Sequence, residues 1–162
     1  MMAQMLRKIS TRITPRMFRF FMNCYPPFIG AGISILEINH NFTYVKVRMK
    51  LTWYNRNYVG TQFGGSLYAM TDPFFMLMLL RNLSKDYIVW DKAAYIDFIK
   101  PGLGEVRAEF RLDQKLIEQI KEKADFNPKY IFDLPVEIIN KDNQLVAKVI
   151  KTLYVRKKSF KN

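Results

Sequence analysis

The clearest pattern in the chain is an alternation of apolar and polar residues over positions 43–51. Val45 and Val47 alternate there with charged residues and a tyrosine, which is the period-2 pattern of a strand with one solvated face. Upstream, Ile33 and Ile35 form the apolar face of an extended segment, and four later runs also have strand composition. We therefore expect strands or extended chain over residues 28–39, 43–51, 87–99, 106–112, 130–139 and 145–155.

Two helices are expected after the first strands. Residues 66–83 are too long a run, and too rich in Met and Leu, for a single strand, so we predict a buried helix that is kinked at Pro73. Residues 114–123 have the pattern of a short charged helix. Long antiparallel strands around one all-apolar helix make an α+β architecture.

A further helical pattern lies at the N-terminus. Apolar residues recur there at helical spacing against a basic face, and Thr14 and Pro15 have the form of an N-cap and first-turn pair. We expect residues 1–23 to form an amphipathic basic helix that packs on the domain. Residues 1–20 contain arginine and no acidic residue, so a membrane-surface helix and a transit-like leader remain alternatives.

The composition is that of a globular protein. A chain of 162 residues with 49% hydrophobic and 25% charged content is expected to form one domain without disulfides or a structural metal. The single Cys24 and single His40 exclude CxxC pairs, zinc knuckles and any catalytic triad that does not use His40. Because the chain has neither a signal-peptide pattern nor an apolar run long enough to span a bilayer, we expect a cytoplasmic protein.

The net charge of +12 suggests a nucleic-acid or anionic surface partner until it is located along the chain. Residues 1–20 carry five basic side chains and residues 148–162 carry six, with no acidic residue in either stretch. Residues 21–147 carry 15 basic and 14 acidic side chains. The body is nearly balanced, so nucleic-acid binding is not expected of it, although two basic termini close in space could form an anion-binding surface.

A glycine pair opens the expected buried helix. Gly64 and Gly65 allow close approach of a ligand to the backbone, and the unpaired amides of a helix start suit an oxygen that is or becomes negative. The same glycines could instead serve only a tight turn, and the sequence leaves both interpretations open.

Asp72 is the one charged residue between positions 57 and 80. A buried carboxylate without partners costs several kcal/mol, so Asp72 is either a candidate general base or is held by Thr71, a tyrosine or a lysine. On one continuous helix, Gly65 and Asp72 would lie roughly 10 Å apart along the axis. If both act on one substrate, one of them must come from a partner subunit, which predicts a symmetric dimer.

These residues carry a resemblance to a known family. The pattern Asn57-x-x-Gly60-Thr61-x-Phe63-Gly64-Gly65, followed by Asp72, resembles the Asn-x-x-Gly-Thr-x-His-Gly-Gly…Asp signature of PaaI-like thioesterases of the hotdog fold. Residues 96–101 resemble the strand of that family that ends in Arg/Lys-Pro, and the chain from residue 146 onward resembles its last strand. Four further segments, 25–28, 55–57, 63–68 and 89–92, resemble an uncharacterised branch of that superfamily with Phe-Gly-Gly in place of His-Gly-Gly. The resemblance implies an antiparallel sheet wrapped around a central helix over residues 24–158, after the N-terminal helix of residues 1–23 and before a basic tail of residues 159–162.

The resemblance also implies an activity, which is hydrolysis of acyl-CoA or a related acyl thioester in a dimer or dimer of dimers. Gly64 and Gly65 amides would polarise the thioester carbonyl, Asp72 of the neighbouring subunit would activate water, and Asn57 would orient the carbonyl or the water. Coenzyme A would enter only as part of the substrate, with no metal and no other cofactor. The residues expected to contact substrate are Thr61, Phe63, Ser66 and Tyr68, with Arg156 and Lys157 near the phosphates of CoA.

Phe63 is the departure from the family signature, because it occupies the position of the histidine. Loss of that histidine removes a polar contact, so a non-catalytic acyl-CoA or lipid-binding protein on the same fold is the alternative. A third interpretation is a protein that binds an anionic surface or nucleic acid through its basic termini, with residues 1–20 at a membrane surface.

Overall fold

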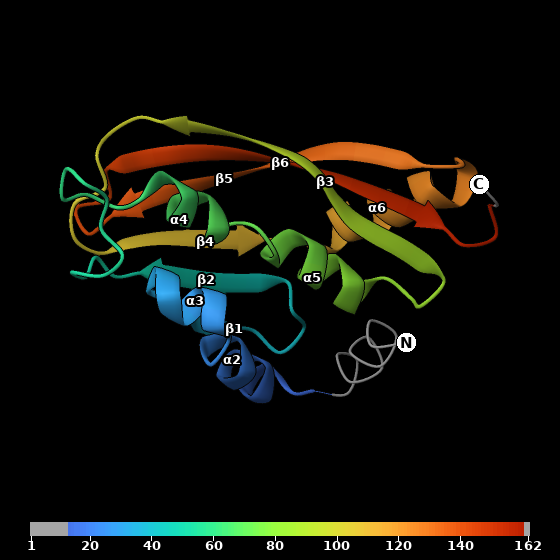
Figure 1. The fold of residues 1–162 in the computed structure, drawn as a ribbon. Helices are drawn as coiled ribbons and strands as arrows, with labels where there is room; N and C mark the ends of the chain where they lie inside the picture. Colours follow the sequence, from blue (N-terminus) through green and yellow to red (C-terminus); the bar gives the residue numbers. More distant parts are fainter. Residues whose placement is uncertain (1–12, 161–162) are drawn as a thin grey trace.

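The computed structural model describes residues 13–160, which form one antiparallel sheet with helices packed against it (Figure 1). The six strands lie in the order β1-β2-β4-β5-β6-β3, and each strand is antiparallel to its neighbours. Along the chain the elements are α2 (Pro15–Asn23), α3 (Pro26–Ala31), β1 (Ile33–Ile38), β2 (Tyr44–Met49), α4 (Gly64–Ala69), α5 (Phe74–Asn82), β3 (Tyr87–Phe98), β4 (Val106–Arg111), α6 (Gln114–Phe126), β5 (Tyr130–Asn140) and β6 (Leu145–Lys157). The expected α+β class is confirmed.

The core lies between the sheet and the helices α4 and α5, which cross one face of the sheet in Figure 1. On β2 the alternation predicted from the sequence is confirmed, since Val45, Val47 and Met49 are buried. Phe74 of α5 meets Phe110 of β4 with ring centroids 4.9 Å apart. Burial of such large apolar side chains, rather than helix propensity, holds these short helices in place.

The single kinked helix predicted over residues 66–83 is wrong, because the chain forms two helices there. Helix α4 ends at Ala69, and α5 begins at Phe74 after a turn that contains Asp72 and Pro73. Proline lacks the N–H for the helical ladder and disfavours helical geometry at the residue before it, so Pro73 ends one helix and opens the next. Asp72 therefore lies in the break, and its spacing from Gly65 is not that of a continuous helix.

The N-terminal region shows one confirmed detail and one correction. The Thr14 side chain accepts a hydrogen bond from the backbone N–H of Met17 at 3.3 Å, which confirms the predicted N-cap of α2. The extended chain expected from residue 28 is wrong up to residue 31, because Pro26 starts helix α3 and Gly32, at φ +73°, ends it. The expected helix within residues 1–12 lies outside the described residues.

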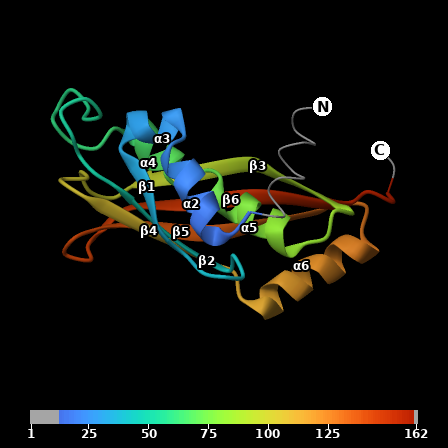
Figure 2. The same ribbon diagram turned by 90° about the horizontal axis from the view of Figure 1, so that it is seen from below.

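The two edges of the sheet differ in what covers them. The outer side of β1 is covered by α2, whose Asn23 side chain hydrogen-bonds both the N–H and the carbonyl of Ile35, at 2.7 and 3.2 Å. At the opposite edge, β3 pairs with β6 and with no other strand of the described residues (Figure 2). Open strand edges invite pairing with another chain, so β3 is the edge available for association.

Strand β3, whose outer edge is unpaired, exposes aromatic side chains to solvent. Trp90 and Tyr95 are 63% and 67% exposed, and the small Ala93 and Ala94 are exposed between them.

Over residues 13–160, no helix has the length and apolar character needed to cross a membrane.

Candidate functional site

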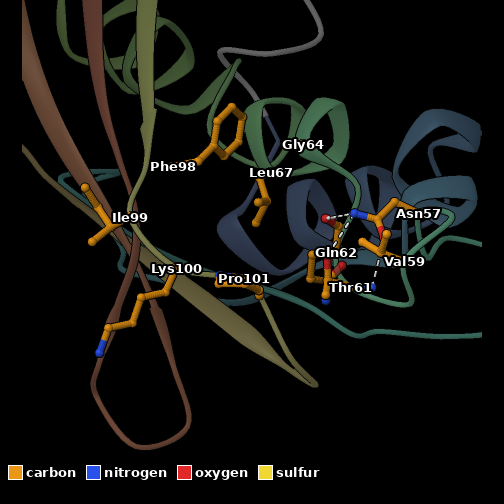
Figure 3. Close-up of a pocket in the computed structure, with 11 residues that line it drawn as sticks. Asn57, Val59, Thr61, Gln62, Gly64, Leu67, Phe98, Ile99, Lys100 and Pro101 are labelled. Carbon is orange, nitrogen blue, oxygen red and sulfur yellow. Dashed lines mark hydrogen bonds between the residues drawn. The ribbon is translucent and has the colours of Figure 1, made fainter.

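A cavity of about 380 Å³ lies where the loop before α4 meets the chain that follows β3 (Figure 3). One wall comes from the loop and the start of α4, including Gly64 and Leu67. The opposite wall comes from the end of β3 and the turn after it, where the Phe98 ring faces Gly64, whereas the Lys100 side chain points away from the loop (Figure 3). The full lining is Asn57, Val59, Thr61, Gln62, Gly64, Leu67, Phe98, Ile99, Lys100, Pro101 and Gly102.

The loop is held in shape by Asn57. Its Oδ1 accepts from the Thr61 N–H at 2.9 Å, while its Nδ2 donates to Thr61 Oγ1 at 2.8 Å and to the Gln62 carbonyl at 3.3 Å. The expected role of Asn57 was to orient a carbonyl or a water. Asn57 lines the cavity, and its side-chain amide bonds are made within the loop, so its observed contacts are those of a residue that shapes the cavity wall.

Gln62 joins the two walls, although no sequence pattern indicated a role for it. Its N–H donates to the Gly102 carbonyl at 2.9 Å, and its side-chain Nε2 donates to the Gly104 carbonyl at 2.8 Å. The side chain is buried, and its position next to Phe63 in the motif was the only available signal. These contacts fix the distance between the start of α4 and the turn that follows β3.

Gly64 and Gly65 present unpaired amides at the start of α4. The N–H groups of Ser66 and Leu67 both donate to the Phe63 carbonyl, whereas those of Gly64 and Gly65 have no hydrogen-bond partner among residues 13–160. Gly64 lines the cavity. A free donor at the cavity wall, with a second one on the adjacent residue, can bind an oxygen that carries negative charge.

Aromatic rings explain why both positions are glycine. A Cβ on Gly65 would lie 2.5 Å from the Phe63 ring, and a Cβ on Gly64 would lie 3.1 Å from the Phe98 ring. Phe63, the departure from the family signature, lies against the backbone of Gly65, and its side chain is 55% exposed. The glycines permit close packing of these rings beside the free amides.

Asp72 lies outside the cavity lining and is bound within its own chain. Its Oδ1 accepts from the Tyr68 hydroxyl at 2.8 Å and from Lys151 Nζ at 2.9 Å. Its side chain nevertheless remains 48% exposed. The partners that the sequence analysis considered, a tyrosine and a lysine, are therefore both present, and Tyr68 belongs to this group rather than to the cavity.

Lys151 and Asp91 complete a cluster that the sequence analysis missed. The Lys151 side chain is 0% exposed, and its Nζ also lies 3.3 Å from Asp91 Oδ1. The signal was present in the period-2 alternation, because Lys151 takes an inward position of β6 among buried neighbours. Asp91 likewise takes an inward position of β3, at a bulge. We call Tyr68, Asp72, Asp91 and Lys151 the Asp72 cluster.

The pKa directions in this cluster follow from burial and charge. Burial works to lower the pKa of Lys151, but Asp72, Asp91 and Tyr68 outweigh it, so the pKa lies above its ordinary value. Burial raises the pKa of Asp91 against the opposing effect of Lys151, and burial together with Asp72 raises the pKa of Tyr68. Lys151 is therefore a permanent buried cation at neutral pH.

The two basic residues expected near CoA phosphates lie away from the cavity at Gly64. Arg156 lines a separate cavity of about 460 Å³ on β3 and β6, together with Asp91, and donates to the Phe160 carbonyl. Lys157 forms an ion pair with Asp125 at 2.9 Å. Lys151, counted among the six cations of residues 148–162, is buried, so the C-terminal stretch is less available to an anionic partner than its sequence indicated.

Within the described part of the chain, no three His, Cys, Asp or Glu side chains are grouped so that they could hold a metal ion. The groups that these sites present are a free N–H donor at an apolar cavity and a half-exposed carboxylate held by a buried cation.

Comparison with known proteins identifies the fold and the family. A structure from Pseudomonas aeruginosa, of a protein of unknown function named a probable thioesterase, is 19% identical, with a TM-score of 0.81 over 91% of this chain and 99% of that one. A thioesterase from Haemophilus influenzae is 16% identical, with a TM-score of 0.63 over 92% and 94% of the two chains. The E. coli PaaI protein is 18% identical, with a TM-score of 0.57 over 85% and 88%.

These similarities show the hotdog fold expected from the sequence. No curated protein matches the sequence. The model of a family described as Domain of unknown function (DUF4442) matches residues 14–155, which is most of the chain. The protein thus has the hotdog fold and belongs to the DUF4442 family.

Proposed function

We propose that the protein hydrolyses acyl thioesters, with acyl-CoA as the expected substrate, in a homodimer whose sites combine residues of both subunits. The observation that carries this proposal is the unpaired amide of Gly64 at the wall of an apolar cavity, with the unpaired amide of Gly65 next to it in the chain. Donors placed where negative charge develops are the main means of stabilising acyl-transfer transition states. The probable thioesterase of the same fold supports the same reaction class.

The proposed reaction uses water as the nucleophile. The water oxygen attacks the thioester carbonyl carbon while an Asp72 oxygen takes one of its protons, and the Gly64 and Gly65 amides stabilise the carbonyl oxygen as it becomes negative. The carbon–sulfur bond then breaks, and the leaving sulfur takes the proton from Asp72. The products are a carboxylic acid and a thiol, and Asp72 returns to its ionised form. Asn57 and Gln62 would act by holding the loop and cavity in shape.

Two observations support a dimer. Asp72 does not line the cavity of its own chain, so a partner subunit must bring its Asp72 to the Gly64 amide if both act on one carbonyl. The open edge of β3 offers a place for that partner, because it ends at Phe98, which itself lines the cavity. A second copy paired along β3 would therefore also cover the cavity mouth.

The decisive experiment measures thiol release from a panel of acyl-CoAs of different chain length, with the purified full-length protein. The wild type should release CoA, and Asp72→Asn should lower kcat by about 10²- to 10⁴-fold, the usual contribution of a general base. Asparagine keeps an oxygen that can accept from Tyr68 and Lys151, so this variant isolates the loss of the base. Acyl-CoA binding without release by either protein would refute the proposed hydrolysis.

The alternative is a non-catalytic acyl-CoA or lipid-binding protein. The observation that favours it is Phe63, whose exposed ring lies against Gly65 where the resembling family has an imidazole. The same thiol-release panel separates the two candidates, since a binding protein would show saturable acyl-CoA binding and no thiol.

A further inference from the structure

The Asp72 cluster places one buried cation between two carboxylates that come from different elements. Lys151 Nζ lies 2.9 Å from Asp72, in the break between α4 and α5, and 3.3 Å from Asp91 on β3. The Tyr68 hydroxyl of α4 lies 3.4 Å from the same Nζ. On the other side of β6, strand β5 places Leu134 beside Lys151. Tyr68, Asp72 and Asp91 are thus the titratable groups that act on Lys151 among the described residues.

The charge balance of the cluster is unusual. Burying an ammonium without partners costs several kcal/mol, and one carboxylate would be enough to pair with it. Here the Lys151 ammonium pairs with two carboxylates, those of Asp72 and Asp91, so the three groups carry a net charge of −1 when all are ionised. Asp91 Oδ1 lies within ion-pair distance of Nζ but accepts no hydrogen bond of good geometry, so Asp72 holds the closer contact with Lys151.

The two carboxylate oxygens of Asp72 differ in their hydrogen bonding. Oδ1 accepts both hydrogen bonds, from Tyr68 and from Lys151, whereas Oδ2 accepts none from the described residues. Since the Asp72 side chain is 48% exposed while Lys151 is fully buried, the cluster anchors one carboxylate oxygen and leaves the other for an external proton donor. A general base needs this arrangement, because its free oxygen must reach the water that it activates.

We propose that Lys151 and Asp91 are positioning residues for Asp72: Lys151 holds Asp72 Oδ1 and so leaves Oδ2 free, and Asp91 is the second carboxylate that holds the Lys151 ammonium. This proposal rests on the proposed function of Asp72 as the base. It assigns a role to Lys151, which is 79 positions away from Asp72 in the chain.

The two positioning residues should act in opposite directions. Lys151→Gln removes the cation and leaves two carboxylates that repel each other, so the acid limb of the pH–rate profile moves to higher pH. Asp91→Asn removes one negative charge and leaves Lys151 to act on Asp72 alone, so the acid limb moves to lower pH. A loss of structure would lower the rate at every pH and would not produce opposite movements.

The experiment combines a pH–rate profile for acyl-CoA hydrolysis with a carbon-13 NMR titration of the Asp72 carboxyl, on the full-length protein. Asp72→Asn identifies the resonance. In Lys151→Gln, kcat should be about tenfold lower or more at the acid end, the deficit should shrink as the pH rises, and KM should change little. Lys148→Gln is the matched control, because Lys148 lies on the same strand and is exposed.

Opposite movements of both the rate profile and the NMR midpoint in Lys151→Gln and Asp91→Asn would support the proposal. Unchanged midpoints, or movement in the same direction, would overturn it. If Lys151→Gln fails to fold, the same criterion applies to Asp91→Asn alone, whose midpoint must fall. If the wild type hydrolyses no thioester while the midpoints still move in opposite directions, the proposed function is refuted and the coupling within the cluster is upheld.

Discussion

Replacing Gly64 by proline removes one candidate oxyanion donor while changing the helix start very little. Gly64 is the first residue of α4, where proline is favoured because no helical N–H bond is made there. The preceding residue, Phe63, has φ −68° and ψ 128°, which is the extended geometry that a following proline requires. The Gly64 N–H has no hydrogen-bond partner among the described residues, so its loss breaks no bond within the chain.

The expected magnitude follows from the two effects of the substitution. The added Cβ would lie 3.1 Å from the Phe98 ring, a tight contact that alanine introduces as well. The missing N–H is specific to proline, and loss of one oxyanion donor lowers kcat by about 10²- to 10³-fold, or roughly 2.7 to 4 kcal/mol of transition-state stabilisation. Gly64→Ala is therefore the matched control, since it changes the packing against Phe98 and keeps the donor.

The assay is thiol release from the best acyl-CoA substrate, with thermal unfolding measured for both variants. We expect both to unfold within a few degrees of each other, and Gly64→Pro to show the larger loss of kcat by at least about tenfold. Equal activities for Gly64→Pro and Gly64→Ala would refute the role of this amide, whatever the absolute rates.

The remaining predictions concern stability and association. Asn55→Ala removes three hydrogen bonds, to Thr52, Ala31 and Lys50, from a buried side chain; at about 1 kcal/mol each, urea unfolding should show a loss of about 3 kcal/mol that the exposed Arg56→Ala does not. Burial, and next the hydrogen bond to Asp125, raises the pKa of Tyr87 to about 12. The neutral Tyr87 side chain therefore contributes stability below pH 10, and this contribution is lost as the pH rises towards 12. The difference in the free energy of unfolding between the wild type and Tyr87→Phe, measured with urea, should become smaller over that pH range. If the proposed dimer forms along the open β3 edge, Tyr95→Lys should sediment as a monomer in sedimentation velocity where the wild type sediments as a dimer.

Local patterns predicted those parts of the fold that depend on local physics. The alternation over residues 43–51 identified β2, and Thr14 with Pro15 identified the start of α2. The break between α4 and α5 was missed because Pro73 was expected only to bend a long apolar helix, whereas it separates two short ones. The apolar composition on both sides of Pro73 is equally compatible with either result.

The candidate site was partly predictable for the same reason. Gly64, Gly65 and Asp72 were recognisable because their types are unusual at the start of, or within, an apolar segment. Lys151 was interpreted as one of several cations near the C-terminus, although it occupies one of the alternating positions of β6 that face the core. Its pairing with Asp72 and Asp91 depends on the register between β3 and β6, which only the three-dimensional structure supplies.

The central claim is that Asp72 of one subunit and the Gly64 amide of the other act on the same thioester. Co-expression of Asp72→Asn and Gly64→Pro chains with different affinity tags allows the mixed dimer to be purified. In that dimer one of the two sites would keep both an intact Asp72 and an intact Gly64 amide, so thiol release should recover to about half of the wild-type rate. Activity no higher than that of the two parent variants would contradict the claim.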